Sequence, residues 1–355
     1  MTATRPAIDR QRLLRLPKAE LHVHLDGSLR PATMLALATE RGVSLPRQDD
    51  AALGAVMEVT DARNLEDYLA RFAVTLSVMQ DAAAIARIAE ELVLDAAADG
   101  VRLLEVRFAP FLSTAQGLTA NDVMAAWMAG MQRGERATGT VARAIVCALR
   151  HTDVAQSIAM AELAVAWKGK GVVAFDLAGG EAGHPASDHR AAFDIARRAD
   201  LAITCHAGEA WGPDSVREAL YDCGAHRIGH GTRLIEDASL LQYVNDRRIP
   251  VEICLTSNVQ TRATPAFAAH PARTFFKRGV VLSLNTDNRL MSGVTLTEEY
   301  ARAAEHLRFS LDDLCVIARQ SFESAFTPWE ERRALLDAVL PEIDAGSASL
   351  AYALL

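Results

Sequence analysis

Short apolar runs rich in β-branched residues alternate with longer segments of helical periodicity along almost the whole chain, and this alternation limits the possible folds most strongly. Strands that alternate with helices build parallel sheets, and eight such strands close a barrel. The eight predicted strands are AELHVHL (19–25), VRLLEVRF (101–108), TVARAIVCAL (140–149), GVVAFDLA (171–178), LAITCHA (201–207), HRIGH (226–230), PVEICLT (250–256) and VVLSLNT (280–286). We therefore predict an α/β fold, a single (β/α)8 TIM-type barrel with a helical insertion after the first strand.

A doubly wound open sheet is the alternative, but the first strand is not followed by G-x-G-x-x-G and the chain has no Walker loop. We expect residues 1–355 to form one domain, in which residues 1–13 are an N-terminal extension and residues 30–100 are the helical insertion. Within that insertion, residues 64–80 (NLEDYLARFAVTLSVMQ) place four large apolar side chains on one face. This face either packs into the core or forms a lid over the barrel mouth; its members are Leu65, Tyr68, Leu69 and Phe72.

Charge and composition narrow the class of partner. The net charge is −8, and the 37 Lys and Arg residues are scattered among acidic ones, which argues against a nucleic-acid partner. The chain has neither a signal-peptide core nor an uncharged apolar stretch long enough to span a bilayer. The five cysteines are far apart and form no C-x-x-C pair, so we expect buried, reduced thiols. We predict a cytoplasmic monomer or homodimer whose partner is a small molecule, without nucleic acid or membrane.

Four metal-ligand side chains fall at the ends of predicted strands, where a barrel of this type places its active site. His22 and His24 are two residues apart in the first strand and so share a face, although an H-x-H pair alone is weak evidence for a metal. His206 ends the fifth strand and Asp287 follows the eighth. Three imidazoles and one carboxylate suit zinc or a similar borderline divalent ion and leave a position for water.

Two further residues fall in the same region. Glu209 lies three residues after His206, where a carboxylic acid beside a metal-activated water would deliver protons, or would merely stabilise the start of the next helix. His230 ends the sixth strand and is either a ligand or a group that orients the water, and the second role is favoured because four better ligands are present.

The motifs LPKAELHVHLDGSLR, EVRFAPFL, FDLAGGE, HAGEAWG, RIGHG, SNVQT and NTDNRLMSG occur in this order from about residue 14 to residue 330. Together they resemble the adenosine deaminases of the metal-dependent amidohydrolase superfamily, particularly the bacterial members. The resemblance implies a hydrolase of purine salvage that uses one zinc ion per chain to convert adenosine, and 2′-deoxyadenosine, to inosine and ammonia. It implies that zinc is bound by His22, His24, His206 and Asp287.

The resemblance also implies roles around the substrate. Glu209 is expected to protonate N1 of the purine, and His230 to position the hydroxide. The backbone N–H of Gly179 is expected to meet N3, and Asp26 to hold the ribose 5′-hydroxyl. The face that carries Leu65, Tyr68, Leu69 and Phe72 is similar to the hydrophobic gate over the base in this family.

One residue departs from the familiar pattern, because Asn288 stands where other adenosine deaminases carry a second Asp that donates to N7. An amide has its own N–H donors, so we keep Asn288 as a base-binding residue. The alternatives are an aminodeoxyfutalosine deaminase, an adenine deaminase, in which Glu usually replaces Asp26, and a catalytically silent nucleoside-binding relative. A binuclear site is disfavoured because the fourth strand ends without a lysine.

Several other polar residues are given lesser roles. We expect His151, Ser257 and Asn258 to be structural or to support the site from behind. The remaining histidines are predicted to lie on the surface of loops or helices, namely His184, His189, His226, His270 and His306.

Overall fold

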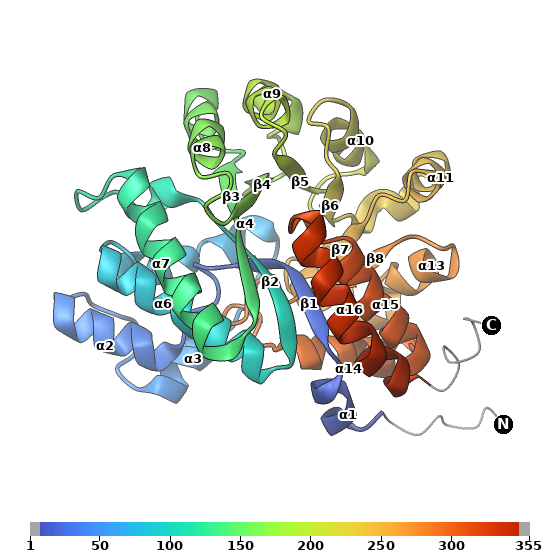
Figure 1. Ribbon diagram of the computed structural model, residues 1–355. Helices are drawn as coiled ribbons and strands as arrows, with labels where there is room; N and C mark the ends of the chain where they lie inside the picture. The colour runs from blue at the N-terminus through green and yellow to red at the C-terminus, as the bar shows by residue number, and fades with distance from the viewer. Residues whose placement is uncertain (1–7, 348–355) are drawn as a thin grey trace.

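Eight parallel strands form a barrel in the computed structural model, which describes residues 8–347 (Figure 1). Each strand pairs with the next in sequence, and their bounds are β1 Lys18–His24, β2 Val101–Phe108, β3 Val141–Leu149, β4 Val172–Ala178, β5 Ala202–Ala207, β6 Arg227–His230, β7 Val251–Ile253 and β8 Leu282–Leu284. This confirms the predicted (β/α)8 barrel. Residues 1–7 of the predicted N-terminal extension lie outside the described residues.

The barrel closes between its first and last strands through backbone hydrogen bonds. The N–H of His24 donates to the carbonyl of Asp287 at 2.7 Å, and the N–H of Asp287 donates to the carbonyl of His22 at 3.0 Å. A parallel bridge between Val23 and Asp287 lies at the same place, and the side-chain oxygen of Asn285 accepts from the N–H of Leu21 at 2.8 Å. The residues that close this seam therefore include three of the predicted metal ligands.

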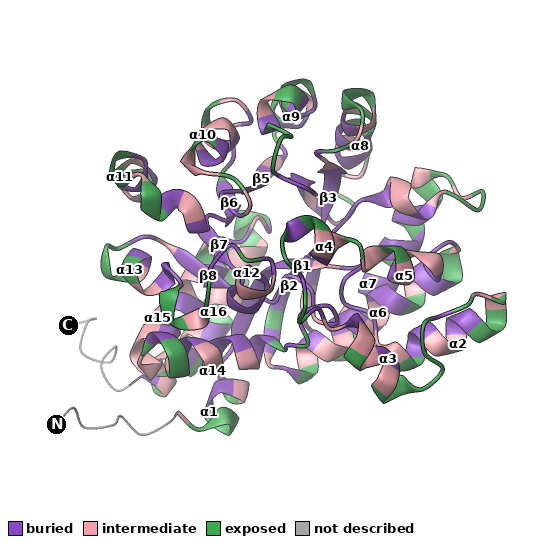
Figure 2. Cartoon of the chain, turned by 180° about the vertical axis from the view of Figure 1, so that it is seen from behind, coloured by how far each residue is buried: buried purple, intermediate pink, exposed green. Residues whose placement is uncertain are grey.

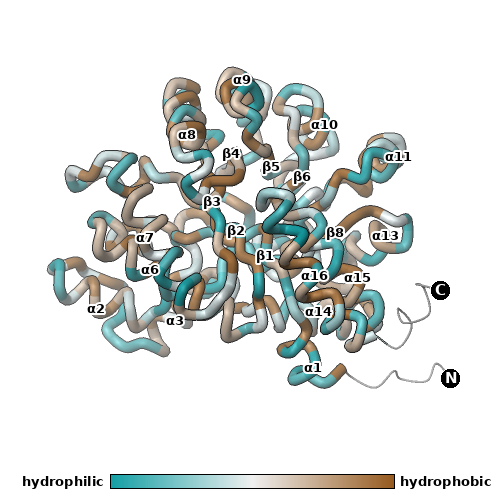
Figure 3. Tube along the Cα trace, in the orientation of Figure 1, coloured by the Kyte–Doolittle hydropathy of each residue, from teal (hydrophilic) through white to brown (hydrophobic). Residues whose placement is uncertain are grey.

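Helices surround the barrel, and their buried faces pack on the strands. Figure 2 shows the strands in purple at the centre, with the exposed green residues on the outer parts of the helices, and in Figure 3 the central strands carry long hydrophobic stretches. The α-helices are α1 Arg10–Arg15, α2 Pro31–Arg41, α3 Asp50–Met57, α4 Leu65–Leu69, α5 Phe72–Ser77, α6 Ala82–Ala98, α7 Ala120–Thr138, α8 Val154–Ala166, α9 Arg190–Arg198, α10 Pro213–Tyr221, α11 Ala238–Asp246, α12 Leu255–Gln260, α13 Ala272–Lys277, α14 Leu296–Leu307, α15 Leu311–Glu323 and α16 Trp329–Gly346. Four short 3-10 helices are η1 Pro110–Ser113, η2 Ala186–His189, η3 Thr232–Glu236 and η4 Phe267–Ala269.

Local sequence signals explain where the longer helices begin and end. The side chain of Asp81 accepts a hydrogen bond from the N–H of Ala84 at 2.9 Å and so caps α6. Helix α7 begins with a reciprocal capping box between Thr119 and Asp122, and it ends at Gly139, whose φ of 76° suits glycine. The apolar stripe of α6, which runs from Ile85 to Val93, is buried against the neighbouring elements.

The structure differs from the sequence-based prediction at the end of the seventh strand. The predicted strand 250–256 stops at Ile253, and α12 begins at Leu255. The reason is a distant carboxylate, because Glu299 in α14 accepts hydrogen bonds from the N–H groups of Leu255 (2.8 Å) and Thr256 (3.2 Å). These bonds satisfy the free amides of a helix start, which a continued strand would have paired elsewhere.

The insertion after β1 contains helices α2 to α6, and Figure 2 shows α4 in front of the barrel strands. We call residues 64–80 the lid segment. The segment is two short helices, α4 and α5, rather than one continuous helix, because the chain turns at Ala70 and Arg71. The guanidinium of Arg71 donates to the carbonyl of Val56 at 2.9 Å, which ties this turn to α3.

Two features expected from composition can be compared with the structure. Among the described residues, no single helix is both long and apolar enough to cross a membrane; Leu65–Ser77 together with Ala82–Ala98 passes that test only as a pair bent by 119°. The five cysteines are free and buried, as predicted for reduced thiols.

Candidate active site

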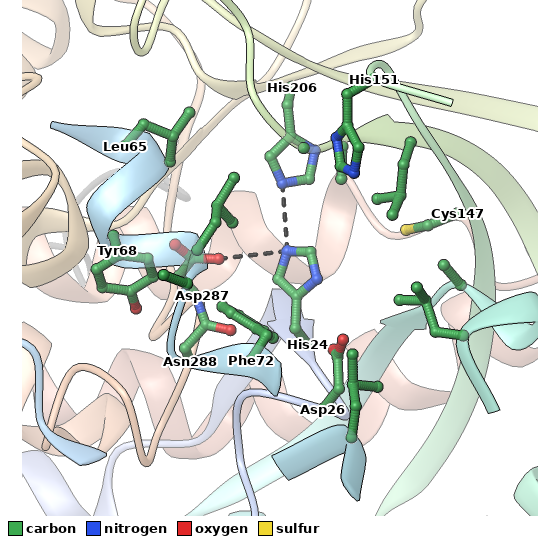
Figure 4. A pocket seen from close by; sticks show the side chains of 18 of the residues that line it. His24, Asp26, Leu65, Tyr68, Phe72, Cys147, His151, His206, Asp287 and Asn288 are labelled. Carbon is green, nitrogen blue, oxygen red and sulfur yellow. Dashed lines mark hydrogen bonds and ion pairs between the residues drawn. The ribbon is translucent and has the colours of Figure 1, made fainter. Parts of the chain in front are cut away.

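The four predicted metal ligands converge at the carboxyl ends of the strands. The Nε2 atoms of His24 and His206 are 3.2 Å apart, and the Oδ1 atom of Asp287 lies 3.3 Å from the Nε2 atoms of both His22 and His24. All four ligand atoms lie within 4.8 Å of one another. Figure 4 shows His24, His206 and Asp287 pointing toward a common position, reached from β1, β5 and the end of β8.

The spacing of these atoms fits one transition-metal ion. With bonds of about 2.0 Å, neighbouring ligand atoms of a four- or five-coordinate ion lie roughly 3 Å apart. The Nε2 atom of His22 is buried and has no hydrogen-bond partner among the described residues. A buried imidazole nitrogen without a hydrogen bond, within 4.8 Å of three other ligand atoms, fits a position for a metal ion.

Buried carboxylates hold two of these imidazoles from behind. The Nδ1 atom of His22 lies 2.8 Å from Oε2 of Glu252, and the Nδ1 atom of His206 lies 3.1 Å from Oδ2 of Asp176. A carboxylate accepts hydrogen bonds only, so each Nδ1 carries the proton and each Nε2 presents its lone pair to the metal position. Sequence reasoning missed Glu252 and Asp176, although each is a charged residue inside an apolar strand.

Two buried arginines keep these carboxylates ionised. Arg107 donates to Asp176 at 2.9 Å and to Glu252 at 2.8 Å, and Arg227 donates to the other oxygen of Glu252 at 2.6 Å. Burial alone would raise the pKa of Glu252, but the charges of Arg107 and Arg227 hold this pKa well below its usual range. The two imidazoles are therefore supported by buried carboxylates that remain ionised inside the barrel.

Glu209, the predicted proton donor, lies beside the metal position and is only 4% exposed. Its Oε2 atom is 3.6 Å from Nε2 of His230, and its Oε1 atom is buried without a hydrogen-bond partner. Burial raises the pKa of Glu209 well above its usual range, and the negative charges of Asp287 and Glu181 raise it further. This shift favours the protonated carboxyl group, which can act as an acid.

Glu181 holds the loop that carries Glu209, and sequence reasoning did not assign it a role. Its carboxylate accepts hydrogen bonds from the N–H groups of Gly208 (2.6 Å), Glu209 (2.9 Å) and Trp211 (3.0 Å), and also from the N–H of Ala210. The motif FDLAGGE, which ends at residue 181, was the available signal. This one side chain fixes the backbone of the acid-bearing loop.

Strained backbone conformations occur at two site residues. His230 has φ of 63° and Asp287 has φ of 62°. Both values lie in the left-handed region, which residues other than glycine seldom adopt. Such conformations cost about 1–3 kcal/mol each and persist only where the surroundings enforce them. At these positions the cost is offset by contacts that aim both side chains toward the metal position.

A cavity of about 310 Å³ opens above the metal position and contains the other predicted site residues. The cavity is lined by residues of the lid segment, which include Leu65, Tyr68, Leu69 and Phe72, and by Asp26, Gly179 and Asn288. Figure 4 shows Asn288 beside Tyr68 and Phe72. Oδ1 of Asp26 and Oδ1 of Asn288 are buried without partners among the described residues. Burial raises the pKa of Asp26 to about 7.

Close approach of the backbone to this cavity depends on glycine at position 179. Gly179 has φ of 91°, and a Cβ added there would lie 2.9 Å from Nδ1 of His151. His151 itself lines the cavity, so it lies closer to the site than its predicted supporting role implied. The remaining cavity wall is mostly apolar, and its residues include no Lys or Arg in the described part of the chain.

Ser257 and Asn258, two of the three residues predicted to be structural or to support the site from behind, contact site residues. The hydroxyl of Ser257 donates to Oδ2 of Asp287 at 2.6 Å, and the side chain of Asn258 contacts Nδ1 of His230 at 2.9 Å. The prediction of surface positions was wrong for two histidines, because His189 is 2% exposed and His270 is 4% exposed. Both are held by hydrogen bonds to distant segments, which a loop-like sequence context does not reveal.

Comparison with known proteins places the chain among deaminases. Residues 17–342 match the family described as adenosine deaminase. An adenosine deaminase from Mycobacteroides abscessus is 43% identical over 351 residues, which cover 94% of this chain and 96% of that protein. The matched region contains every residue of the candidate active site.

Solved structures show the same barrel at lower identity. The crystal structure of an adenine deaminase from Arthrobacter aurescens superposes with a TM-score of 0.86 at 26% identity, covering 93% of this chain and 99% of that one. An amidohydrolase from Burkholderia ambifaria, solved with bound Zn, gives a TM-score of 0.87 at 26% identity and covers 98% of each chain.

Proposed function

Because this chain belongs to the adenosine deaminase family, we propose that its cavity binds adenosine and replaces the 6-amino group by oxygen, giving inosine and ammonia. The observation that carries the proposal is the convergence of four metal-ligand atoms and a buried carboxyl group of raised pKa in one largely apolar cavity. 2′-Deoxyadenosine shares the base and the 5′-hydroxyl and is the second expected substrate. The reaction recovers purines, so we assign the enzyme to purine salvage.

We assign one zinc ion per chain to His22, His24, His206 and Asp287. Three nitrogen ligands and one oxygen ligand at the observed spacing support zinc, and the similar amidohydrolase from Burkholderia ambifaria contains Zn. When bound, such an ion lowers the pKa of a coordinated water to about 7 and supplies a nucleophile at neutral pH.

Glu209 delivers a proton to N1 of the purine. Addition of oxygen at C6 breaks the ring conjugation and moves an electron pair onto N1, so an acid at N1 stabilises the transition state more than the ground state. The raised pKa of Glu209 favours the protonated carboxyl group that this step needs. His230, whose Nε2 is 3.6 Å from Oε2 of Glu209, orients the attacking oxygen. When the C6 carbonyl forms, the proton of the added hydroxyl passes through the Glu209 carboxylate to the amino group, which leaves as ammonia.

The rest of the cavity positions the nucleoside. Asp26 accepts from the 5′-hydroxyl, the N–H of Gly179 donates to N3 and the amide of Asn288 donates to N7. The lid segment covers the base with Tyr68 and its apolar neighbours, and the hydroxyl of Tyr68 is held 3.0 Å from Ser292 Oγ. A buried carboxyl at the sugar end and a wall without Lys or Arg favour a nucleoside over a nucleotide, whose phosphate needs cations.

Two considerations bear on the alternatives. The adenine deaminase from Arthrobacter aurescens shares the fold at 26% identity, whereas the adenosine deaminase from Mycobacteroides abscessus shares 43%, which supports the nucleoside. The five buried free thiols support a reducing compartment, so we place the enzyme in the cytoplasm.

The test is ammonia release by the purified zinc-loaded protein with adenosine, 2′-deoxyadenosine, adenine, AMP and aminodeoxyfutalosine. We expect adenosine and 2′-deoxyadenosine to be the preferred substrates. Glu209→Gln is the matched control, because it keeps the shape of the side chain and should lower kcat by about 100-fold or more. Preference for another compound would replace the substrate assignment, and absence of turnover with all five would refute the proposed function.

A further inference from the structure

Three polar side chains form a buried chain of hydrogen bonds that ends at His230. Nε2 of His270 lies 3.1 Å from Oδ1 of Asn258, and Nδ2 of Asn258 lies 2.9 Å from Nδ1 of His230. Asn258 is fully buried, and His230 and His270 are 1% and 4% exposed. We call these three residues the relay. His270 lies outside the metal-ligand set and the cavity, and the roles assigned so far make no use of it.

A backbone N–H group next to His270 determines which nitrogen of the His270 ring carries the proton, and so which groups of the relay donate. The N–H of Ala272 donates to Nδ1 of His270 at 3.1 Å. A backbone amide can only donate, so Nδ1 of His270 is an acceptor and carries no proton. The proton of neutral His270 is therefore on Nε2, which faces Asn258. Burial lowers the pKa of His270 to about 3, so the ring stays neutral throughout the neutral pH range.

The orientation of the Asn258 side-chain amide determines which nitrogen of His230 accepts a hydrogen bond. Nε2–H of His270 needs an acceptor, so the side-chain oxygen of Asn258 faces His270 and its NH2 group faces His230. The opposite orientation would set an NH2 group against an N–H, leaving a buried donor without an acceptor. The NH2 group of Asn258 then donates to Nδ1 of His230, which must be the unprotonated nitrogen.

We propose that His270 and Asn258 are positioning residues that fix His230 with its proton on Nε2, so that His230 donates a hydrogen bond to the attacking oxygen and does not accept its proton. The proposal rests on the proposed function, which places the attacking oxygen beside His230. An imidazole whose Nδ1 receives a hydrogen bond has no free lone pair on Nε2. The contact between the Asn258 NH2 group and Nδ1 therefore assigns the N–H of the His230 ring to Nε2.

This assignment gives His230 and its neighbour Glu209 different roles in the reaction. Nε2 of His230 points toward Oε2 of Glu209 at 3.6 Å, so its N–H stabilises negative charge on this side of the cavity. Glu209 becomes a carboxylate once its proton has passed to N1, and it is then the proton acceptor within reach. His230 supplies orientation and charge stabilisation, whereas Glu209 alone moves protons.

The direct test is nitrogen-15 NMR of the histidine rings in the zinc-loaded enzyme and in the metal-free protein. The His230 signals are identified by their loss in His230→Gln. We expect Nδ1 of His230 in the range of an unprotonated ring nitrogen and Nε2 in the range of a protonated one. The reverse pattern in the wild-type protein would overturn the proposal. Because this readout does not depend on turnover, it separates the proposal from the proposed function.

Variants of His270 provide the second test. His270→Leu removes the donor, so we expect the His230 signals to move toward a mixture of tautomers and kcat to fall about 10-fold or more, with KM within about 2-fold. His270→Gln keeps an N–H donor for Asn258 and an oxygen acceptor for Ala272, and it should retain the tautomer and kcat within about 3-fold. Unchanged signals and kcat in His270→Leu would refute the relay.

A control variant separates the relay from general loss of packing. His189→Leu removes another buried histidine, whose ring contacts Ser157 and the carbonyl of Arg150 rather than Asn258. We expect it to lower stability while leaving the His230 signals as in the wild type. A shift of the His230 signals in this variant as large as in His270→Leu would refute a specific role for His270. If His270→Leu does not fold, the wild-type spectrum and His270→Gln still decide the question.

Discussion

Replacing Glu181 by Gln tests whether one carboxylate organises the loop that carries Glu209. Oε2 of Glu181 accepts from the amides of residues 209–211, and Oε1 accepts from the N–H of Gly208 and from the hydroxyl of Ser215. In Glu181→Gln the amide oxygen takes the place of Oε2, where three N–H groups converge. The NH2 group then takes the place of Oε1, and Ser215 can rotate its hydroxyl to accept from it, but Gly208 loses its acceptor.

The expected loss in the free energy of unfolding follows from the hydrogen bonds that Glu181→Gln removes or weakens. One hydrogen bond to a charged acceptor is lost, which costs about 1.5–3 kcal/mol, and the remaining bonds weaken because the acceptor is now neutral. Glu181 is 5% exposed, so solvent screens this loss little. We expect the free energy of unfolding, measured by urea denaturation, to fall by about 3 kcal/mol. The control Ser215→Ala keeps the charge and every amide contact of Glu181 and should cost about 1 kcal/mol.

The same change has a kinetic signature. The negative charge of Glu181 helps to raise the pKa of Glu209, so Glu181→Gln should lower that pKa. The acid form of Glu209 is the active one, and activity is lost as pH rises through its pKa. The falling limb of kcat on the alkaline side should therefore move to lower pH in Glu181→Gln and stay in place in Ser215→Ala. An unchanged limb together with unchanged stability in Glu181→Gln would refute the role given to this carboxylate.

Three further predictions follow from single contacts. Asp176→Asn weakens the support of His206 and should reduce zinc affinity about 10- to 100-fold in a chelator competition, and unchanged affinity would contradict the support assigned to that carboxylate. Gly27→Ala would place a Cβ 1.8 Å from Oδ1 of Asn288 and displace that amide. We expect KM for adenosine to rise about 10-fold and stability to fall by about 1–3 kcal/mol. A Gly27→Ala variant with the KM and kcat of the wild type would exclude the contact between Asn288 and N7. Tyr68→Phe should cost about 1 kcal/mol in thermal or urea unfolding and leave KM within about 2-fold, whereas Tyr68→Ala uncovers the cavity and should raise KM clearly more. Equal KM values in the two Tyr68 variants would show that the ring does not cover the base.

The sequence is sufficient where the relevant geometry is local. His22 and His24 share a face because side chains alternate along a strand, and the rule that barrel strands end at the active site brings His206 and Asp287 to the same mouth. The strand VRLLEVRF is found at the predicted residues 101–108, since its apolar run is bounded by a glycine and a proline-containing turn.

The sequence is insufficient where a distant side chain decides the outcome. The seventh strand is shorter than its apolar run because Glu299 lies 44 residues further along the chain and captures the amide of Leu255. His270 resembles a loop residue until Asn258, 12 residues away, is seen to receive its N–H. In the sequence Glu252 is a charged residue within an otherwise apolar strand. Only the folded barrel shows that it contacts His22, 230 residues away.

The seam that closes the barrel joins residues from nearly opposite ends of the chain, because His22 and His24 pair through their backbones with Asp287. During synthesis the two histidines leave the ribosome some 260 residues before that aspartate. An unfinished chain thus carries imidazoles but neither the carboxylate nor the neighbouring strand that holds them in place. Stable metal loading is therefore expected to wait for the last strand, so that the ion is retained only by chains that have been completed and have closed.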